Sequence, residues 1–454
     1  MNMERNTTGL LTPGEMALAR KSLDIARTLG AGKVRVTLNK SLLELVGMLD
    51  GEVDKVTHAL DRSLQVALFV DGRFGTFSTN RLEEAELEGF IRKGIDMVRM
   101  LAPDPCRDLP DPSRVAKDAP GGRELDLYDP AVEELTPERR RALATGSALK
   151  NRTGDGWKVV SEEGEYSDSV FDSIVMDSQG LCARHTETSF EIGYEVTVES
   201  ADGDRYSAYW WDASPRYADI LPSLATCAGT ALARAVGQIG PQFCAGGKMN
   251  VVVESECASK LLNPLLTALG GYSVQQKNSF LADRLGEQVF PSCLTVLDRP
   301  RVAGANGARL FDSEGVATVE APVIEEGTVK IFFLNTYIAR KMDAAPTVED
   351  CTRAVVLPTG GCRTLEDVLR KVGDGILVTG FNGGNSNSST GDFSYGIEGY
   401  AFAGGKIVHP VREMLMTGNF ISLWNNLTDV ADDARACMSK LIPTLAFSNV
   451  DVNG

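Results

Sequence analysis

The chain has 454 residues, of which 43% are hydrophobic and 24% are charged, as is typical of folded globular proteins. This length exceeds what one ordinary core organises, so two or three domains are expected. Acidic residues outnumber basic residues by 62 to 46, and the resulting formal net charge of −16 disfavours direct contact with nucleic acid.

The N-terminal hundred residues predict a mixed α/β domain. Thr12 and Glu15 have the spacing of a capping box, with Pro13 at the first helical position, and Gly30 is expected to end that helix. Asp71-Gly72 is a typical hairpin turn. Alternating apolar residues predict separate strands at 34–38, 43–45, 64–70 and 74–77. One-sided apolar spacing predicts a helix from about 82 to 101.

Prolines then mark an extended connector over residues 103–124. Helices are predicted at about 137–151 and 217–236. Between them, short alternating segments predict an antiparallel meander. Its turns are expected at Glu163-Gly164, Gln179-Gly180 and Asp202-Gly203.

The C-terminal part is rich in strands and glycines. A strand at 249–254 is expected to lead into a helix at about 255–269, and a last helix is predicted at about 430–441. Residues 400–402 and 406–408 predict a hairpin that turns at Gly404-Gly405.

These elements predict an α+β fold, in which a mixed N-terminal α/β domain precedes a β-rich, barrel- or sandwich-like C-terminal domain. The expected divisions are an α+β domain at 1–102, the Pro-rich connector at 103–124, a helix plus antiparallel meander at 125–238, and the β-rich domain at 239–454.

Nine scattered cysteines include no Cys-x-x-Cys pair, which favours thiols in a reducing cytoplasm over a disulfide framework or a zinc ribbon. The start of the chain lacks the apolar stretch of a signal peptide, and no apolar run approaches membrane-spanning length, so no membrane association is expected. His58, His185 and His409 are too far apart for a familiar ligand spacing, so this chain is not expected to build a metal site.

Residues 380–396 consist almost wholly of Gly, Asn, Ser and Thr around Asp392-Phe-Ser394. One interpretation is a flexible surface loop; the other is a segment whose backbone approaches another chain closely. Asp392 is either a general base or, as we favour, the cap of a turn. Ser394 does not lie in a Gly-x-Ser-x-Gly nucleophile elbow.

Four motifs follow one another in the C-terminal half: Thr390-Gly-Asp-Phe-Ser394, Gly399-Tyr400, Pro410-Val-Arg-Glu413 and Gly418-Asn419. In this order they resemble the TldD/PmbA family, long labelled "modulator of DNA gyrase", and specifically its PmbA (TldE) branch. In the TldD branch, a strand like 249–254 feeds a helix with His-Glu-x-x-x-His, which binds zinc and activates water. Here Asn263, Pro264 and Ala268 stand at the positions of the first histidine, the glutamate and the second histidine.

The resemblance implies a subunit without zinc ligands or catalytic residues of its own. It would pair with a zinc-bearing TldD-like subunit to form a metallopeptidase that acts on unfolded or extended peptides. The residues expected to bind peptide are Asn382, Gly383, Gly384, Thr390, Gly391, Asp392, Phe393 and Ser394. Extended peptides can be held by strand addition, which relies on backbone hydrogen bonds.

Two other functions remain open at this point. One is a non-enzymatic binding or scaffold protein, which would form a homodimer. The other is a metal-independent hydrolase that uses Asp392 or Ser394. The gyrase label then describes an indirect effect, through turnover of a gyrase-directed peptide or toxin. The sequence leaves open the substrate, the cleavage specificity and the choice between homodimer and heterodimer.

Overall fold

The computed structural model describes residues 10–454, which divide into two compact units. Unit 1 comprises the chain up to Ala233 together with Arg301–Thr318, and unit 2 comprises Arg234–Pro300 together with Val319–Gly454. The expectation about a signal peptide concerns residues 1–9, which lie outside the described residues.

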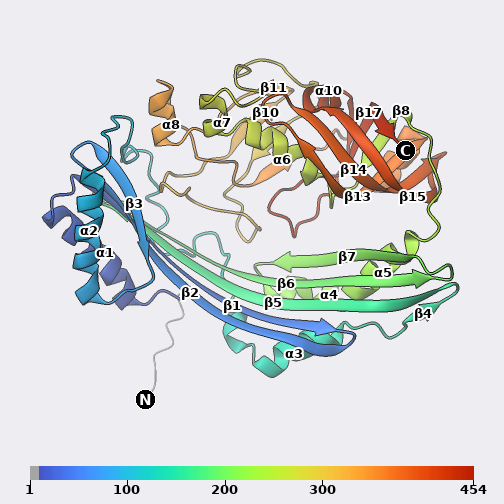
Figure 1. Ribbon diagram of the computed structural model, residues 1–454, viewed down its shortest axis with the longest axis horizontal. Coiled ribbons are helices and arrows are strands. Elements are labelled where there is room, and N and C mark those ends of the chain that lie inside the picture. The colour runs from blue at the N-terminus through green and yellow to red at the C-terminus, as the bar shows by residue number, and fades with distance from the viewer. Residues whose placement is uncertain (1–9) are drawn as a thin grey trace. The chain divides into compact units, whose positions relative to one another are not determined.

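Unit 1 is built on a seven-stranded antiparallel sheet in the order β3-β2-β1-β5-β6-β7, with β4 paired to β5 (Figure 1). The strands are β1 (Lys33–Leu49), β2 (Glu52–Val70), β3 (Arg73–Thr79), β4 (Thr153–Gly154), β5 (Trp157–Asp177), β6 (Cys182–Ser200) and β7 (Arg205–Ser214). Buried and less buried residues alternate along much of β6, as expected for strands whose side chains point to opposite faces.

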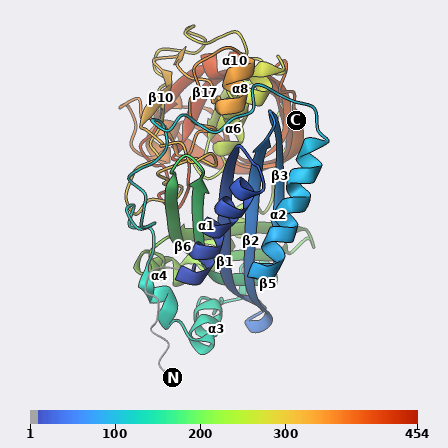
Figure 2. The same ribbon diagram turned by 90° about the vertical axis from the view of Figure 1, so that its left-hand side faces the viewer.

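Helices α1 (Pro13–Thr28) and α2 (Glu84–Arg99) lie against one face of this sheet (Figure 2). The predicted capping box is confirmed: the Glu15 amide donates to Thr12 Oγ1 at 3.2 Å, and the Thr12 amide donates to Glu15 Oε2 at 2.9 Å. Apolar residues of both helices and three strands form the core between them, which includes Leu23, Ala26, Val34, Val36, Leu38, Leu64, Val66, Leu87, Ile91, Ile95, Val98 and Ile174.

The predicted strands at 34–38 and 43–45 are one continuous strand, β1, of 17 residues. The polar residues between them do not turn the chain, because they pair with β2 on one side and β5 on the other. Lys40 Nζ donates to Glu15 Oε1 at 2.9 Å, so this strand interior has a polar partner on α1.

The turn predicted at Glu163-Gly164 is also wrong, because both residues lie inside β5. Gly164 packs beneath an aromatic ring; a Cβ atom there would come within 2.5 Å of Tyr194. Gly180 and Gly203 do turn the chain, with φ values of 108° and 88°.

The remaining helical segments of the first 240 residues are a 3₁₀ helix (Pro130–Glu134), α3 (Pro137–Gly146), α4 (Tyr217–Leu224) and α5 (Cys227–Gly237). Thus α3 ends earlier than predicted, and the single helix predicted at 217–236 is two helices with a 48° bend. Within residues 10–454, no single helix is long and apolar enough to cross a membrane; only the bent pair α4 and α5 passes on length and composition together.

A second core of unit 1 contains part of the Pro-rich segment 103–124, which forms no helix or named strand. Val115 bridges to Val316, and the Ala116 amide donates to the Gly315 carbonyl at 2.9 Å. Residues 301–318 therefore pack with the first unit although they interrupt the second in sequence.

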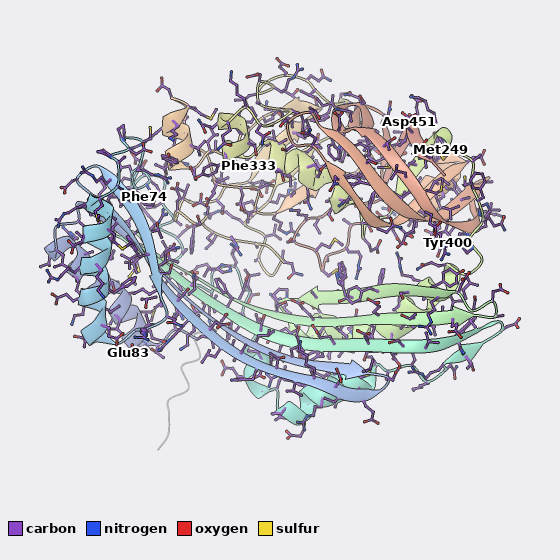
Figure 3. All side chains as sticks on the ribbon, viewed as in Figure 1. Phe74, Glu83, Met249, Phe333, Tyr400 and Asp451 are labelled. Carbon is purple, nitrogen blue, oxygen red and sulfur yellow. The ribbon has the colours of Figure 1, made fainter. Side chains whose placement is uncertain are left out.

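Unit 2 is dominated by a β-barrel whose five strands follow the order β15-β14-β13-β8-β17, closed by pairing of β15 with β17. The strands are β8 (Gly247–Val253), β13 (Gly375–Ser386), β14 (Asp392–Ala403), β15 (Lys406–Asn419) and β17 (Leu445–Asn453), with β16 (Leu427–Val430) beside β17. Figure 3 places Met249, Tyr400 and Asp451 on three of these strands. The predicted α+β fold is confirmed, and the C-terminal domain is a barrel.

A four-stranded sheet in the order β11-β10-β9-β12 completes the strands of unit 2. Its members are β9 (Val296–Asp298), β10 (Ala321–Glu325), β11 (Thr328–Val329) and β12 (Ala354–Val356). The helices wholly within the unit are α6 (Ser259–Ala268), α7 (Gly271–Gln275), α8 (Thr336–Lys341), α9 (Leu365–Val372) and α10 (Phe420–Asn425).

The helix predicted at 430–441 does not form. Val430 ends β16 instead, and its amide donates a hydrogen bond to Thr359 Oγ1 at 3.2 Å. Further along, the Leu441 amide donates to the Ala354 carbonyl at 2.8 Å. Contacts with distant segments therefore override the local helical preference of this stretch.

Candidate functional site

A cleft of about 320 Å³ in unit 2 lies between helix α6 and the tip of the β13–β14 hairpin. Asn263 and Pro264, which are expected from the sequence resemblance to stand at positions of the zinc motif, both line it. The other lining residues are Lys260, Thr267, Phe280, Ser386, Asn387, Ser388, Tyr395 and Phe420. Amide and hydroxyl groups therefore surround the cleft, together with aromatic rings.

Helix α6 is fixed by its apolar face, since Leu261, Leu265 and Ala268 are buried at helical spacing. The Trp424 indole of α10 reinforces this packing by donating to the Leu261 carbonyl at 3.4 Å. The opposite side of α6 is thereby presented to the cleft.

The residues of α6 do not fit the zinc ion that the TldD-like motif holds. Asn263 Oδ1 accepts a hydrogen bond from Lys440 Nζ at 2.6 Å, so a cation already occupies this amide oxygen. Pro264 and Ala268 have no side-chain donor atom, and Ala268 is only 1% exposed. Among the described residues, no group of three or more His, Cys, Asp or Glu side chains is arranged to hold a metal ion.

The hairpin tip at residues 387–391 is an ordered turn. The Asn387 amide donates to the Asp392 carbonyl at 2.8 Å, and the Gly391 amide donates to the Asn387 carbonyl at 2.8 Å. Gly391 has a φ of 81°, and a Cβ atom there would come within 3.0 Å of the Phe280 ring. Both the backbone conformation and the close ring favour glycine at this position.

The Asp392 carboxylate braces this turn. It accepts hydrogen bonds from Asn419 Nδ2 at 2.9 Å and from Thr390 Oγ1 at 2.7 Å. These two bonds, that from Asn419 first, lower the pKa of Asp392 below its ordinary value. A carboxylate that is ionised and committed to two donors suits the role of a turn cap better than that of a general base.

Stacked aromatic side chains form the floor of the cleft. The Phe420 ring lies 4.8 Å from Phe393 and 6.0 Å from Phe280, measured between centroids, and both pairs are stacked. Tyr395 continues the stack at 5.3 Å from Phe393, and the Lys260 ammonium lies 4.6 Å from the Tyr395 ring centroid.

None of the eight residues expected to bind peptide lines this cleft, but all lie in the hairpin whose tip borders it. Asn382 Oδ1 lies over Gly396, and Gly384, with a φ of 97°, packs against the Ser394 carbonyl. Thr390, Gly391 and Asp392 shape the tip, as described above.

Several lining residues had no signal in the sequence. Lys260, Phe280 and Phe420 are separated by up to 160 residues and meet only in the folded unit. The phenylalanines were expected neither as binding nor as catalytic residues, because isolated aromatic residues are most often core residues.

A second cleft of about 370 Å³ lies on another side of α6 and shares Thr267 with the first. Lys440, which binds Asn263, lines it together with Glu349, Asp350 and Cys351. Burial, followed by the charge of Asp298, raises the pKa of the Cys351 thiol, so this thiol is protonated at neutral pH.

The segment that joins β8 to α6 carries a further titratable cluster. Arg234 forms a bidentate ion pair with Glu254, at 2.9 and 2.7 Å. Burial, followed by the charges of Glu254 and Glu256, raises the pKa of the Cys257 thiol. Neither this thiol nor that of Cys351 is activated as a nucleophile.

Comparisons with known proteins cover most of the chain. The chain matches three domains of one metallopeptidase family. They are PmbA/TldA metallopeptidase domain 1 over residues 35–98, the PmbA/TldA metallopeptidase central domain over 130–239, and the PmbA/TldA metallopeptidase C-terminal domain over 246–454. Metalloprotease PmbA of Escherichia coli O157:H7 is 28% identical over 442 residues, which are 95% of this chain and 96% of the relative.

Two solved structures are similar over nearly the whole chain. A crystal structure of a putative modulator of DNA gyrase from Bacteroides thetaiotaomicron is 37% identical with a TM-score of 0.91, covering 98% of this chain and 100% of that one. TldE from Thermococcus kodakarensis has a TM-score of 0.82 over 96% of this chain and 100% of its own, and at 17% identity it shows the shared fold alone.

The domain matches and the similarity to PmbA agree with the resemblance found in the sequence. This chain belongs to the PmbA/TldD metallopeptidase family, as a PmbA/TldE-like member.

Proposed function

We propose that this chain is the peptide-positioning subunit of a two-subunit zinc peptidase, and that a TldD-like partner supplies the zinc. The observation that carries this proposal is the cleft beside α6. It lies beside the residues that the sequence resemblance places at the zinc motif, and it is lined by hydrogen-bonding and aromatic groups.

The chemistry of the lining suits the backbone of an unfolded peptide. The side chains of Asn263, Thr267, Ser386, Asn387 and Ser388 offer amide and hydroxyl groups, which can both donate to and accept from peptide groups. The aromatic floor offers apolar contact to substrate side chains of varied size. Backbone recognition of this kind would discriminate little between the internal sequences of peptides.

The β13 strand offers an edge for strand addition. It pairs with β8 only through Ile376, Leu377 and Val378, although it runs on to Ser386. Within the described part of the chain, no strand pairs with this edge of β13 beyond Val378. An extended peptide that paired there would pass Asn382, Gly383 and Gly384 and reach the cleft at Ser386.

Its place of action would be the reducing cytoplasm. All nine cysteines lie in the described part of the chain, and none is in a disulfide bond.

Backbone recognition is tested by titrating the purified chain with an unfolded peptide and with the same peptide N-methylated at alternate amides. Methylation removes donors without changing the side chains, so we expect at least tenfold weaker binding, about 1.4 kcal/mol. As a control, methylating the intervening amides should weaken binding much less, because those amides point away from the paired edge. Equal affinity for all three peptides would refute strand addition.

A further inference from the structure

We infer that the cleft holds the C-terminal end of a peptide and that Lys260 binds its terminal carboxylate. This inference rests on the proposed function, since it assumes that the cleft takes a peptide. It adds the chemical group that is recognised and the residue that recognises it.

The charge of the cleft points to an anionic group. Lys260 is the only Lys, Arg, Asp or Glu among the lining residues, although the whole chain carries a formal net charge of −16. No described carboxylate forms an ion pair with Lys260, whose ammonium group lies over the Tyr395 ring. Binding of an anion would therefore not have to displace a carboxylate of the protein.

The position of the ammonium group is defined by the ring below it. Lys260 Nζ lies 4.6 Å from the centroid of Tyr395, and Tyr395 is itself packed at 5.3 Å from Phe393 and 5.7 Å from Phe381. An ammonium held over an aromatic face keeps N–H donors available for a ligand, because the ring attracts its charge through the ring quadrupole and does not occupy those donors with a lone-pair acceptor. Tyr395 thus acts as a positioning residue for Lys260.

Further groups around the cleft complement a carboxylate. The hydroxyls of Ser386, Ser388 and Thr267 can donate to the second carboxylate oxygen. Lys440, bound to Asn263 at 2.6 Å, adds a second positive charge beside the cleft. None of the ten lining residues is Asp or Glu, so no carboxylate of the lining would repel the ligand.

The size of the cleft favours the end of a chain over an internal acidic side chain. At about 320 Å³ it is near the lower limit for ligand pockets, too small for a long extended segment. A terminal residue could place its carboxylate at Lys260 and its side chain on the partly exposed ring of Phe280, which is stacked on the buried ring of Phe420. The preferred ligand is therefore a peptide with a free C-terminus and an apolar or aromatic last residue.

The test uses three short N-acetylated peptides of otherwise equal sequence, titrated calorimetrically into the full chain. One ends in Phe with a free carboxylate, one ends in Phe-amide, and one ends in Phe-amide but carries an internal Glu. For the wild type we expect the free acid to bind about tenfold more tightly than either amide, with a preference that falls as salt concentration rises. Lys260→Gln should abolish the preference, and Lys260→Arg should keep most of it.

Lys406→Gln is the matched control, because Lys406 is an exposed lysine of unit 2 outside the cleft and its loss changes the net charge equally. It should preserve the wild-type preference. Equal binding of acid and amide by the wild type, or a preference that survives Lys260→Gln, would overturn the inference while leaving backbone recognition intact. Tight binding of the internal-Glu amide would overturn the C-terminal assignment. Failure of every peptide to bind would overturn both this inference and the proposed function of the cleft.

Discussion

Replacing Phe420 with Leu should separate the stability of unit 2 from the function of its cleft. Phe420 is fully buried and contacts three aromatic rings, those of Phe280, Phe393 and Tyr395. A nearly volume-conserving core exchange costs about 1 kcal/mol, and loss of the ring contacts adds about 1 kcal/mol. We therefore expect Phe420→Leu to lower the free energy of unfolding by about 2 kcal/mol.

The matched control is Phe447→Leu. Phe447 is 1% exposed in the same unit, and its ring packs edge-on against Trp424. It does not line the cleft. Its replacement should cost about 1.5 kcal/mol. Urea titration measures both losses, and peptide titration of the folded proteins measures the affinity.

Only Phe420→Leu should weaken binding of a Phe-terminated peptide, by about tenfold, because Phe420 stacks on the Phe280 ring that lines the cleft and Phe447 does not. If both variants bind the peptide as tightly as the wild type, the cleft is not its site. If both variants lower the affinity for the peptide equally, the effect comes from the general stability of unit 2, and the argument for an aromatic floor fails.

Two further predictions concern the hairpin. Asn419→Ala should speed amide hydrogen exchange at residues 387–391 and raise the pKa of Asp392. The loss of folding stability in this variant should become smaller as the pH falls below 3.8, because a carboxylate whose pKa is lowered in the folded state stabilises the fold only above its unfolded-state pKa. Asn335→Ala, which removes the N-cap of α8, controls for loss of the Asn419 cap on α10. Alanine at Asn382 or Ser394 should weaken partner-dependent cleavage without lowering the urea midpoint, and unchanged cleavage would remove these residues from the peptide path.

Local patterns predicted much of the fold correctly. The capping box at Thr12 depends on four consecutive residues, and the Asp71-Gly72 turn depends on two, so tertiary context has little influence on either. The alternation that predicted an antiparallel meander is present along much of β6, because one register buries its apolar residues. The replacement of the zinc motif at Asn263, Pro264 and Ala268 stays a prediction, which rests on residue identity alone.

The wrong predictions arose where distant contacts decided the local structure. The polar interruption of β1 at Lys40 is satisfied by Glu15 of α1, and Gly164 inside β5 is covered by Tyr194. Residues 430–441 do not form the predicted helix, because they make hydrogen bonds with segments near Thr359 and Ala354 instead. Such partners cannot be identified from a local window of sequence.

The cleft itself could be predicted only in part. The resemblance drew attention to α6 and to the 380–396 hairpin, and the structure brings these two segments together. The aromatic floor and Lys260 could not be foreseen, because their significance depends on which rings meet across the folded unit. The segment for which a flexible loop was one interpretation is a β-hairpin with an ordered turn.

The central claim is tested most directly by measuring hydrolysis of an unfolded peptide. The assay compares this chain alone, a TldD-like subunit alone and the two mixed, each with and without a metal chelator. Our account predicts no hydrolysis by this chain alone, and hydrolysis by the mixture that the chelator abolishes. Hydrolysis by the isolated chain that survives the chelator would contradict the account and would direct the search for catalysis to Asp392 and Ser394.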